Sequence, residues 1–187
     1  MNQVRVLTAA FVLCAASTAA LQAQASASTG TQPLRNASLE QRLAHVNELL
    51  ALTPLVDGHN DLPWAIRESK TAPMDVGAYD LTKPTRGMTD LARLRKGHVG
   101  GQFWSVYVPG EVKDSGFARI QLEEIDILKQ ILAKYPAALQ PAFSAAQIRA
   151  AHKSGKVASL MGMEGGHVIE NSLGALRAYY DLGARYM

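Results

Sequence analysis

Two short segments carry the side chains whose types and spacing could perform chemistry. In the first, VDGHNDLPW, His59 and Asp61 lie two residues apart at the end of an apolar run typical of a short buried strand. Side chains two apart on a strand share a face, and an imidazole with a carboxylate is a suitable pair of ligands for Zn²⁺. The same residues also fit a strand-end turn in which Asp61 caps the next turn and His59 is simply polar. His-x-Asp alone therefore leaves metal binding open.

The second segment, MGMEGGH, ends another apolar run with Glu164. A carboxylate at the end of a buried strand must be paired, neutral or bound to a metal. Gly165 and Gly166 allow the backbone to turn tightly and leave open space beside it. A structural glutamate, hydrogen-bonded to the amides of the next helix, is the alternative. His167 could add a ligand, but we interpret it as a loop histidine.

The other reactive residue types give weaker signals. His98 lies in a basic turn, and His45 and His152 lie on predicted helices away from strand ends, so we expect all three at the surface. Ser105 lacks the Gly-x-Ser-x-Gly context of a serine nucleophile. The single cysteine, Cys14, lies in the first 25 residues, and no glycine-rich phosphate loop or dinucleotide-binding fingerprint is present.

The N-terminal residues predict export. Arg5 is followed by an uncharged, mostly apolar run over residues 6–21 and by Ala23-Gln24-Ala25, a pattern typical of a secretory signal peptide over 1–25. The run is shorter than the ~20 residues that a membrane-spanning helix needs, so we expect no transmembrane anchor. The predicted location is therefore secreted or periplasmic. Removing Arg5 with the signal lowers the net charge from +3 to +2, which favours neither nucleic acid nor another polyanion as a partner.

The elements that must position the two segments alternate along the chain. Residues 26–37 are Ser-, Thr- and Gln-rich and predict a flexible lead-in, followed by one domain over 38–187. Strands and helices alternate after it, which indicates an α/β fold with parallel strands and helical crossovers. The units present would make about half of a (β/α)8 barrel, although the pattern alone also fits a doubly wound sheet. Strands are predicted over 55–59, 100–108 and 157–163 with a fourth starting at 185, and helices over 38–53, 90–96, 115–134, 144–154 and 172–182.

Taken together, three segments resemble the membrane (renal-type) dipeptidase family. The similarity extends from about Ser38 to Met187, and three motifs in order are far more specific than His-x-Asp by itself. The resemblance implies a (β/α)8 (TIM-like) barrel, of which this chain is the N-terminal half, truncated near the fourth strand. It also implies two zinc ions near the carboxyl ends of the strands. The matching segments are LVDGHNDLPWAIR, DLARLRKGHVGGQFWSVYVP and KVASLMGMEGGHVIENSLGALRAYYDLGARYM.

The resemblance further assigns roles. His59 and Asp61 would ligate the first zinc and Glu164 would bridge both, while the metals polarise the peptide carbonyl of a dipeptide substrate and supply a hydroxide nucleophile. Trp64 and Tyr107 would be walls of the substrate pocket. The family also needs later histidines and an acidic group, which would lie beyond the end of this sequence, so we expect the chain as given to be inactive.

Other functions stay open at this stage. Another barrel metallohydrolase, of the lactonase or deaminase type, is the first alternative, but such enzymes often carry His-x-His where this chain has Asp61. A truncated, non-catalytic binding protein is the second alternative. A homodimer is one oligomeric state to test.

Overall fold

The computed structural model describes residues 34–112 and 116–187. The predicted signal peptide and most of the lead-in lie outside the described residues. The described residues divide into two units between His45 and Val46. The boundary between them falls within helix α2 (Leu39–Leu52), which follows a short 3-10 helix, η1 (Leu34–Asn36). The predicted capping box is confirmed, because the Gln41 N–H donates to Ser38 Oγ at 3.2 Å and the Ser38 N–H donates to Gln41 Oε1 at 2.9 Å.

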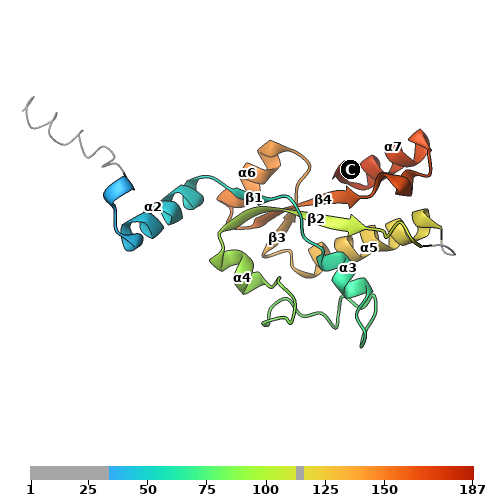
Figure 1. Ribbon diagram of the computed structural model, residues 1–187, viewed down its shortest axis with the longest axis horizontal. Helices are drawn as coiled ribbons and strands as arrows, with labels where there is room; N and C mark the ends of the chain where they lie inside the picture. The colour runs from blue at the N-terminus through green and yellow to red at the C-terminus, as the bar shows by residue number, and fades with distance from the viewer. Residues whose placement is uncertain (1–33, 113–115) are drawn as a thin grey trace, which may run out of the picture. The chain divides into compact units, whose positions relative to one another are not determined.

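A five-stranded parallel sheet forms the centre of the second unit (Figure 1). β1 pairs with β2 and β2 pairs with β4, while β3 and β5 pair with different stretches of β4 along its other side. The order β1, β2, β4, β5 follows the chain order, whereas a doubly wound sheet would reverse direction at a switch point. The α/β class with parallel strands is therefore confirmed. The strands are β1 (Leu55–Asp57), β2 (Val99–Tyr107), β3 (Leu139–Pro141), β4 (Val157–Glu164) and β5 (Ala184–Tyr186).

Helices cover the two faces of this sheet unequally. On one face, Trp104 and Met161 belong to the main core together with residues of α3, α4, α5 and α7. On the opposite face, α6 packs on Ala158 and Leu160 near the amino ends of the strands. Figure 1 shows α6 across the sheet from α3, α4 and α5. The helices are α3 (Leu62–Arg67), α4 (Leu91–Lys96), α5 (Phe117–Lys134), α6 (Ala145–Lys153) and α7 (Leu173–Leu182), with η2 (Gly166–Ile169) before α7.

The helix starts agree with the residues that predicted them. Asp90, Ser144 and Ser172 each accept a hydrogen bond from the backbone N–H three residues later, at 2.7, 3.3 and 3.1 Å. The Arg93 backbone N–H that donates to Asp90 is also the main reason why the pKa of this carboxyl is lowered. Within the described residues, no helix combines the length and the apolar character needed to cross a bilayer.

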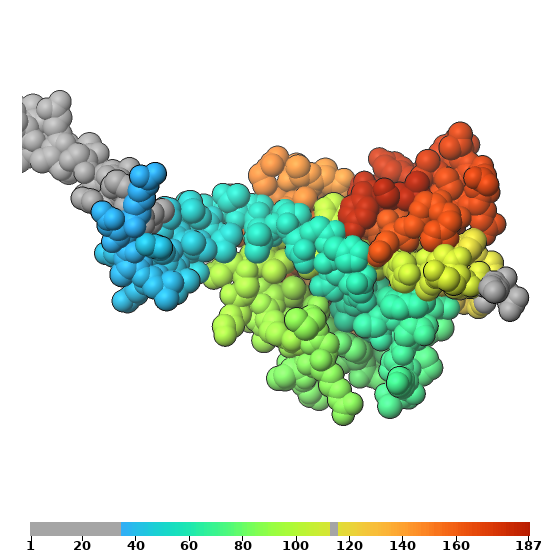
Figure 2. Space-filling model, in the orientation of Figure 1, coloured from blue at the N-terminus to red at the C-terminus, as the bar shows by residue number. Residues whose placement is uncertain are grey.

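The end of β1 differs from the prediction. A strand was expected over 55–59, but it ends at Asp57, so that His59 lies in the turn after it. Four residues separate the end of β1 from the start of helix α3, which has Asp61 at its N-cap. Pro63 lies in the first turn, where a missing N–H costs no helical hydrogen bond. The space-filling view shows the teal segment after β1 at the surface (Figure 2). The turn therefore replaces the flat strand end on which the shared-face argument rested.

Candidate metal centre

The three predicted ligands come together at the carboxyl ends of β1 and β4. His59 Nε2 lies 2.9 Å from Asp61 Oδ1 and 3.3 Å from Glu164 Oε2. One ligand atom from each residue can be chosen so that all three lie within 4.8 Å of one another. Two segments separated by about a hundred residues thus converge on a point at the end of a parallel sheet where ligand sites are usually formed.

The geometry of these atoms fits a metal ion. With metal–ligand bonds of about 2.0–2.2 Å, two ligand atoms of a tetrahedral zinc site lie roughly 3.3–3.5 Å apart. The separation of His59 Nε2 and Glu164 Oε2 falls in that range, whereas His59 Nε2 and Asp61 Oδ1 lie closer together, at 2.9 Å. The side chains of His59, Asp61 and Glu164 are 47%, 58% and 45% exposed, so the centre is open to solvent and to a substrate.

The turn that carries His59 and Asp61 is fixed to β2. In the register of β1 and β2, Val56 lies opposite Gly101 and Asp57 opposite Gln102. Beyond the end of β1, the Ser105 N–H donates to the carbonyl oxygen of Asn60 at 2.9 Å. The turn thus continues along β2 without being part of the regular sheet. This bond holds the backbone between the two candidate ligands against β2.

Glu164 is held from the neighbouring strand. Ser105 Oγ donates a hydrogen bond to Glu164 Oε2 at 3.1 Å, and Tyr107 lies opposite Glu164 in the register of β2 and β4. Gly165 follows with a φ of 108°, a conformation that a residue with a side chain rarely adopts. Sequence reasoning considered Ser105 only as a nucleophile and missed this contact. Its signal was its place two residues before Tyr107, which is visible only once the strand register is known.

Trp64 and Tyr107, the two predicted pocket walls, are in contact with each other. Their rings meet edge to face with centroids 5.3 Å apart. Tyr107 on β2 lies opposite Glu164 on β4, and Trp64 lies on α3, three residues after Asp61. The structure therefore places Tyr107 opposite Glu164 and Trp64 in contact with Tyr107.

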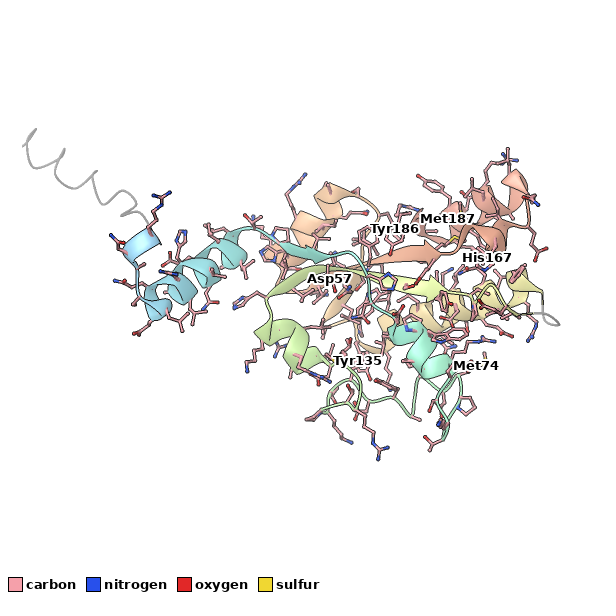
Figure 3. All side chains as sticks on the ribbon, viewed as in Figure 1. Asp57, Met74, Tyr135, His167, Tyr186 and Met187 are labelled. Carbon is pink, nitrogen blue, oxygen red and sulfur yellow. The ribbon has the colours of Figure 1, made fainter. Side chains whose placement is uncertain are left out.

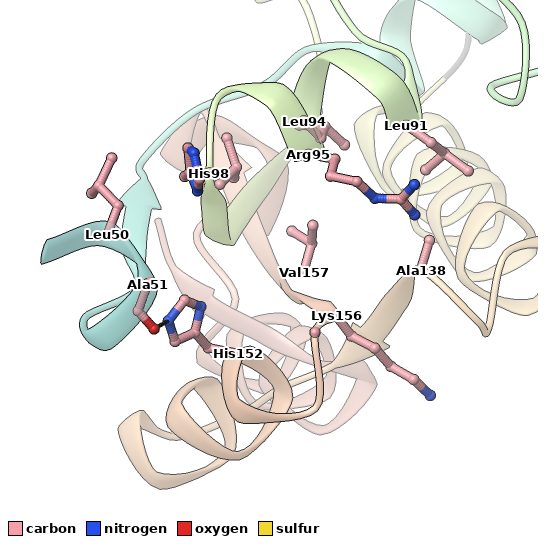
Figure 4. Close-up of a pocket in the computed structure, with 12 residues that line it drawn as sticks. Leu50, Ala51, Leu91, Leu94, Arg95, His98, Ala138, His152, Lys156 and Val157 are labelled. Carbon is pink, nitrogen blue, oxygen red and sulfur yellow. Dashed lines mark hydrogen bonds between the residues drawn. The ribbon is translucent and has the colours of Figure 1, made fainter. Parts of the chain in front are cut away.

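Three other histidines of the second unit, His98, His152 and His167, have other partners or surroundings. The His167 ring donates to the Val108 carbonyl at 2.9 Å and meets Phe117 edge to face at 4.7 Å. His98 and His152 line a separate pocket of about 160 Å³ near the amino ends of the strands (Figure 4). There the His152 ring donates to the Ala51 carbonyl at 3.2 Å. Among the described residues, the group able to hold a metal is His59, Asp61 and Glu164.

Tyr186 on β5, labelled in Figure 3, contacts the backbone of the turn that carries the first candidate ligand. Its hydroxyl donates to the Gly58 carbonyl at 2.9 Å, directly before His59, and its ring packs on Phe103. A Cβ atom on Gly162 would overlap this ring, so the glycine provides the space that the tyrosine fills. Burial, with a smaller contribution from the Glu164 carboxylate, raises the pKa of Tyr186, which keeps its hydroxyl a donor.

The fold and the centre together define an α/β protein with a His, Asp and Glu cluster of metal-binding type at the carboxyl ends of its strands. The family model described as membrane dipeptidase (peptidase family M19) matches residues 43–187. The chain is also 42% identical over 149 residues to Dipeptidase 3 of Rattus norvegicus. The chain therefore belongs to the membrane dipeptidase family.

Solved structures share the fold. A metallo peptidase from Rhodobacter sphaeroides, solved with a phosphinate mimic of the dipeptide L-Ala-D-Ala, superposes on 72% of this chain and 44% of its own length, with a TM-score of 0.62 and 23% identity. The probable dipeptidase PvdM from Pseudomonas aeruginosa superposes on 80% of this chain and 38% of its own, with a TM-score of 0.64 and 20% identity. The match to rat Dipeptidase 3 covers 79% of this chain but only 28% of the relative.

Proposed function

We propose that the protein containing this chain is a zinc-dependent dipeptidase that hydrolyses the peptide bond of dipeptides. The observation that carries the proposal is the convergence of His59, Asp61 and Glu164 in a chain that belongs to the membrane dipeptidase family. The name of the rat relative and the dipeptide mimic bound to the bacterial metallo peptidase support the same substrate class.

In this proposal the three side chains divide the metal ligands between two ions. His59 and Asp61 would hold the first zinc, and the Glu164 carboxylate would be shared between it and a second zinc. A shared carboxylate lowers the repulsion between two dications held ~3.5–4 Å apart. When bound, the zinc ions supply Lewis-acid polarisation of the peptide carbonyl and an activated water. Ser105 orients Glu164 for this role through its hydrogen bond to Oε2.

Trp64 and Tyr107 bind and shield the substrate in this scheme. Their edge-to-face contact forms an aromatic wall next to Glu164, and Arg67 lies 6.0 Å from the Trp64 ring. Such a wall excludes water from one side of the substrate, which strengthens electrostatic interactions with the metal centre. The aromatic pair thus supports a small, partly apolar substrate.

The barrel, the location and the oligomeric state are further parts of the proposal. The unreversed strand order and the fold shared with the bacterial peptidases support a closed (β/α)8 barrel in the intact protein. The apolar N-terminal run followed by Ala23-Gln24-Ala25 supports secretion. A homodimer is the oligomeric state to test first, by light scattering of the intact protein.

The experiment compares the intact protein, expressed at its natural length, with single variants of its ligands. Wild-type protein loaded with Zn²⁺ should release free amino acids from dipeptides. His59→Ala and Glu164→Gln should lose most of the bound zinc and most of the activity, because each removes a ligand of the shared centre. His152→Ala is the matched control, since this histidine lies in the pocket at the other end of the sheet.

Two outcomes would contradict the proposal. A Glu164→Gln protein with full zinc occupancy and full activity would rule out the bridging carboxylate. A wild-type protein that hydrolyses lactones but no dipeptide would support the alternative function, a barrel metallohydrolase of the lactonase type.

A further inference from the structure

We propose that Gln102 is a positioning residue for the metal ligands His59 and Asp61, and that it acts through Asn60 and Asp57. The inference rests on the proposed metal centre and extends it to a buried amide that touches neither ligand side chain. Gln102 lies on β2 and is 1% exposed. An amide in such a place costs free energy unless its polar atoms are bonded, so its partners show what it holds.

The first partner of Gln102 is the residue between the two ligands. Its Oε1 accepts a hydrogen bond from Asn60 Nδ2 at 3.4 Å, and the same Nδ2 donates to Thr89 Oγ1 at 2.9 Å. Asn60 Oδ1 accepts from the Leu62 N–H at 3.1 Å, which ties the side chain to the start of α3. The Asn60 carbonyl already accepts from the Ser105 N–H. Both the side chain and the backbone of this residue are therefore fixed.

The second partner lies on the other side of His59. Gln102 Nε2 donates to Asp57 Oδ2 and to the Phe103 carbonyl, both at 3.0 Å. Asp57 Oδ1 in turn accepts from the His59 N–H at 3.4 Å. Only the NH₂ group of the amide can donate to a carboxylate, so its orientation is determined by this contact. One buried side chain thus joins the residue two before His59 to the residue directly after it.

The third member of the network is Thr89, which is 7% exposed. It lies in the segment just before α4, and its backbone carbonyl accepts a hydrogen bond from Thr85 Oγ1 at 2.7 Å. The network therefore connects the ligand turn with β2 and with the long loop that precedes α4. An open cleft of about 600 Å³ borders these residues and includes His59, Asn60, Asp61, Thr89 and Gln102 in its lining.

This arrangement restricts the positions of two ligands without occupying a coordination site. Groups that orient metal ligands typically change metal affinity or activity by 10- to 100-fold when they are removed. An apolar side chain in place of Gln102 would fill a similar volume but leave Asn60 and Asp57 without its hydrogen bonds. The two ligands would then sample a wider range of positions, and the centre would bind its ion more weakly.

The test uses the intact protein and Zn²⁺, with affinity measured by competition against a chromophoric chelator. Gln102→Leu should raise the Kd for Zn²⁺ on the order of 10- to 100-fold. Gln121→Leu is the matched control, because Gln121 is a buried glutamine on α5 whose amide donates to the Val106 carbonyl. Its zinc affinity should equal that of the wild type. Unfolding midpoints of the metal-free variants separate loss of stability from loss of affinity.

A second pair of variants keeps the test decisive if Gln102→Leu does not fold. Thr89→Val removes the hydroxyl that accepts from Asn60 and should weaken zinc binding, whereas Thr89→Ser retains it and should restore wild-type affinity. Unchanged affinity in both Gln102→Leu and Thr89→Val, with a wild-type protein whose zinc is lost in His59→Ala, would overturn the positioning role alone. A wild-type protein that binds no zinc would overturn the proposed metal centre together with it.

Discussion

Glu124 should make the protein less stable as the pH rises, and Glu124→Gln should remove that dependence. This carboxyl lies on α5, is 0% exposed, and neither of its oxygens has a hydrogen-bond partner among the described residues. Burial raises its pKa from 4.5 to about 8, although the charge of Arg67 acts in the opposite direction. Arg67 forms its close ion pair with Glu123 instead, with Nη1 and Oε2 2.7 Å apart. Glu124 therefore stays protonated in the folded protein at neutral pH.

The direction of the pH effect on stability follows from the pH at which Glu124 releases its proton in each state. The unfolded chain ionises this carboxyl above pH 4.5, whereas the folded protein keeps the proton until about pH 8. Raising the pH between these values therefore favours the unfolded state, and above pH 8 the effect levels off. At about 1.4 kcal/mol per pH unit, the loss reaches about 3 kcal/mol at pH 7 and about 5 kcal/mol in full. Below pH 4.5 both states are protonated, so none of this stability is lost.

The assay is urea unfolding of the intact, metal-free protein at several values between pH 4.5 and 8.5, with a chelator present so that metal binding does not contribute. Glu124→Gln has a similar shape but cannot ionise. Its free energy of unfolding relative to the wild type should therefore increase by about 3 kcal/mol between pH 4.5 and pH 7. Glu111→Gln removes an exposed carboxylate and should show no such change.

The reasoning would be refuted by a parallel pH dependence of the wild type and Glu124→Gln. Such a result would mean that Glu124 is ionised in the folded protein and stabilised by a partner.

Two further predictions concern Gly162 on β4 and Ser105, which lies opposite it on β2. Gly162→Ala should lower the free energy of unfolding, measured with urea, by roughly 1–3 kcal/mol, because the new Cβ overlaps the Tyr186 ring. In a Tyr186→Ala background the same substitution should lower it by less. Ser105→Ala removes the donor to Glu164 Oε2 and should weaken Zn²⁺ binding on the order of 10-fold in a chelator competition, whereas equal affinity would show that Glu164 is positioned without it.

Much of the fold could be predicted because its signals are local. Helix α2 begins where Ser38 and Gln41 form a capping box, and α7 begins where Ser172 caps it. The alternation of apolar runs with helical periodicity predicted the parallel sheet. Helix α3 was not predicted although it is as long as α4, because Asp90 caps α4 with its side chain whereas Asp61 makes no such hydrogen bond at the start of α3. Strand β3 was not predicted because it is short and ends in Pro141, and proline is rare inside strands. The turn after Asp57 was not predicted either, because the predicted strand continued through Gly58 to His59, although glycine favours turns.

The candidate site was predictable in its ligands but not in its supports. Residue type alone left metal binding by His59 and Asp61 open. The resemblance to a known family selected these two with Glu164 as candidate ligands, and the structure brings the three side chains together. Gln102 and Ser105 are ordinary polar residues inside a predicted strand. Their roles depend on which residue of a neighbouring strand or turn lies opposite, and that information is absent from a single sequence.

Strand β2 connects the two halves of the centre because its alternate residues face opposite sides. On one face, Ser105 and Tyr107 lie next to Glu164 on β4. On the other face, Gln102 fixes the turn that carries His59. A slip of β2 by one residue would exchange the two faces and disrupt both sets of contacts at once. The register of β2 therefore fixes the positions of candidate ligands from β4 and from the turn after β1. A change in that register should displace His59, Asp61 and Glu164 together.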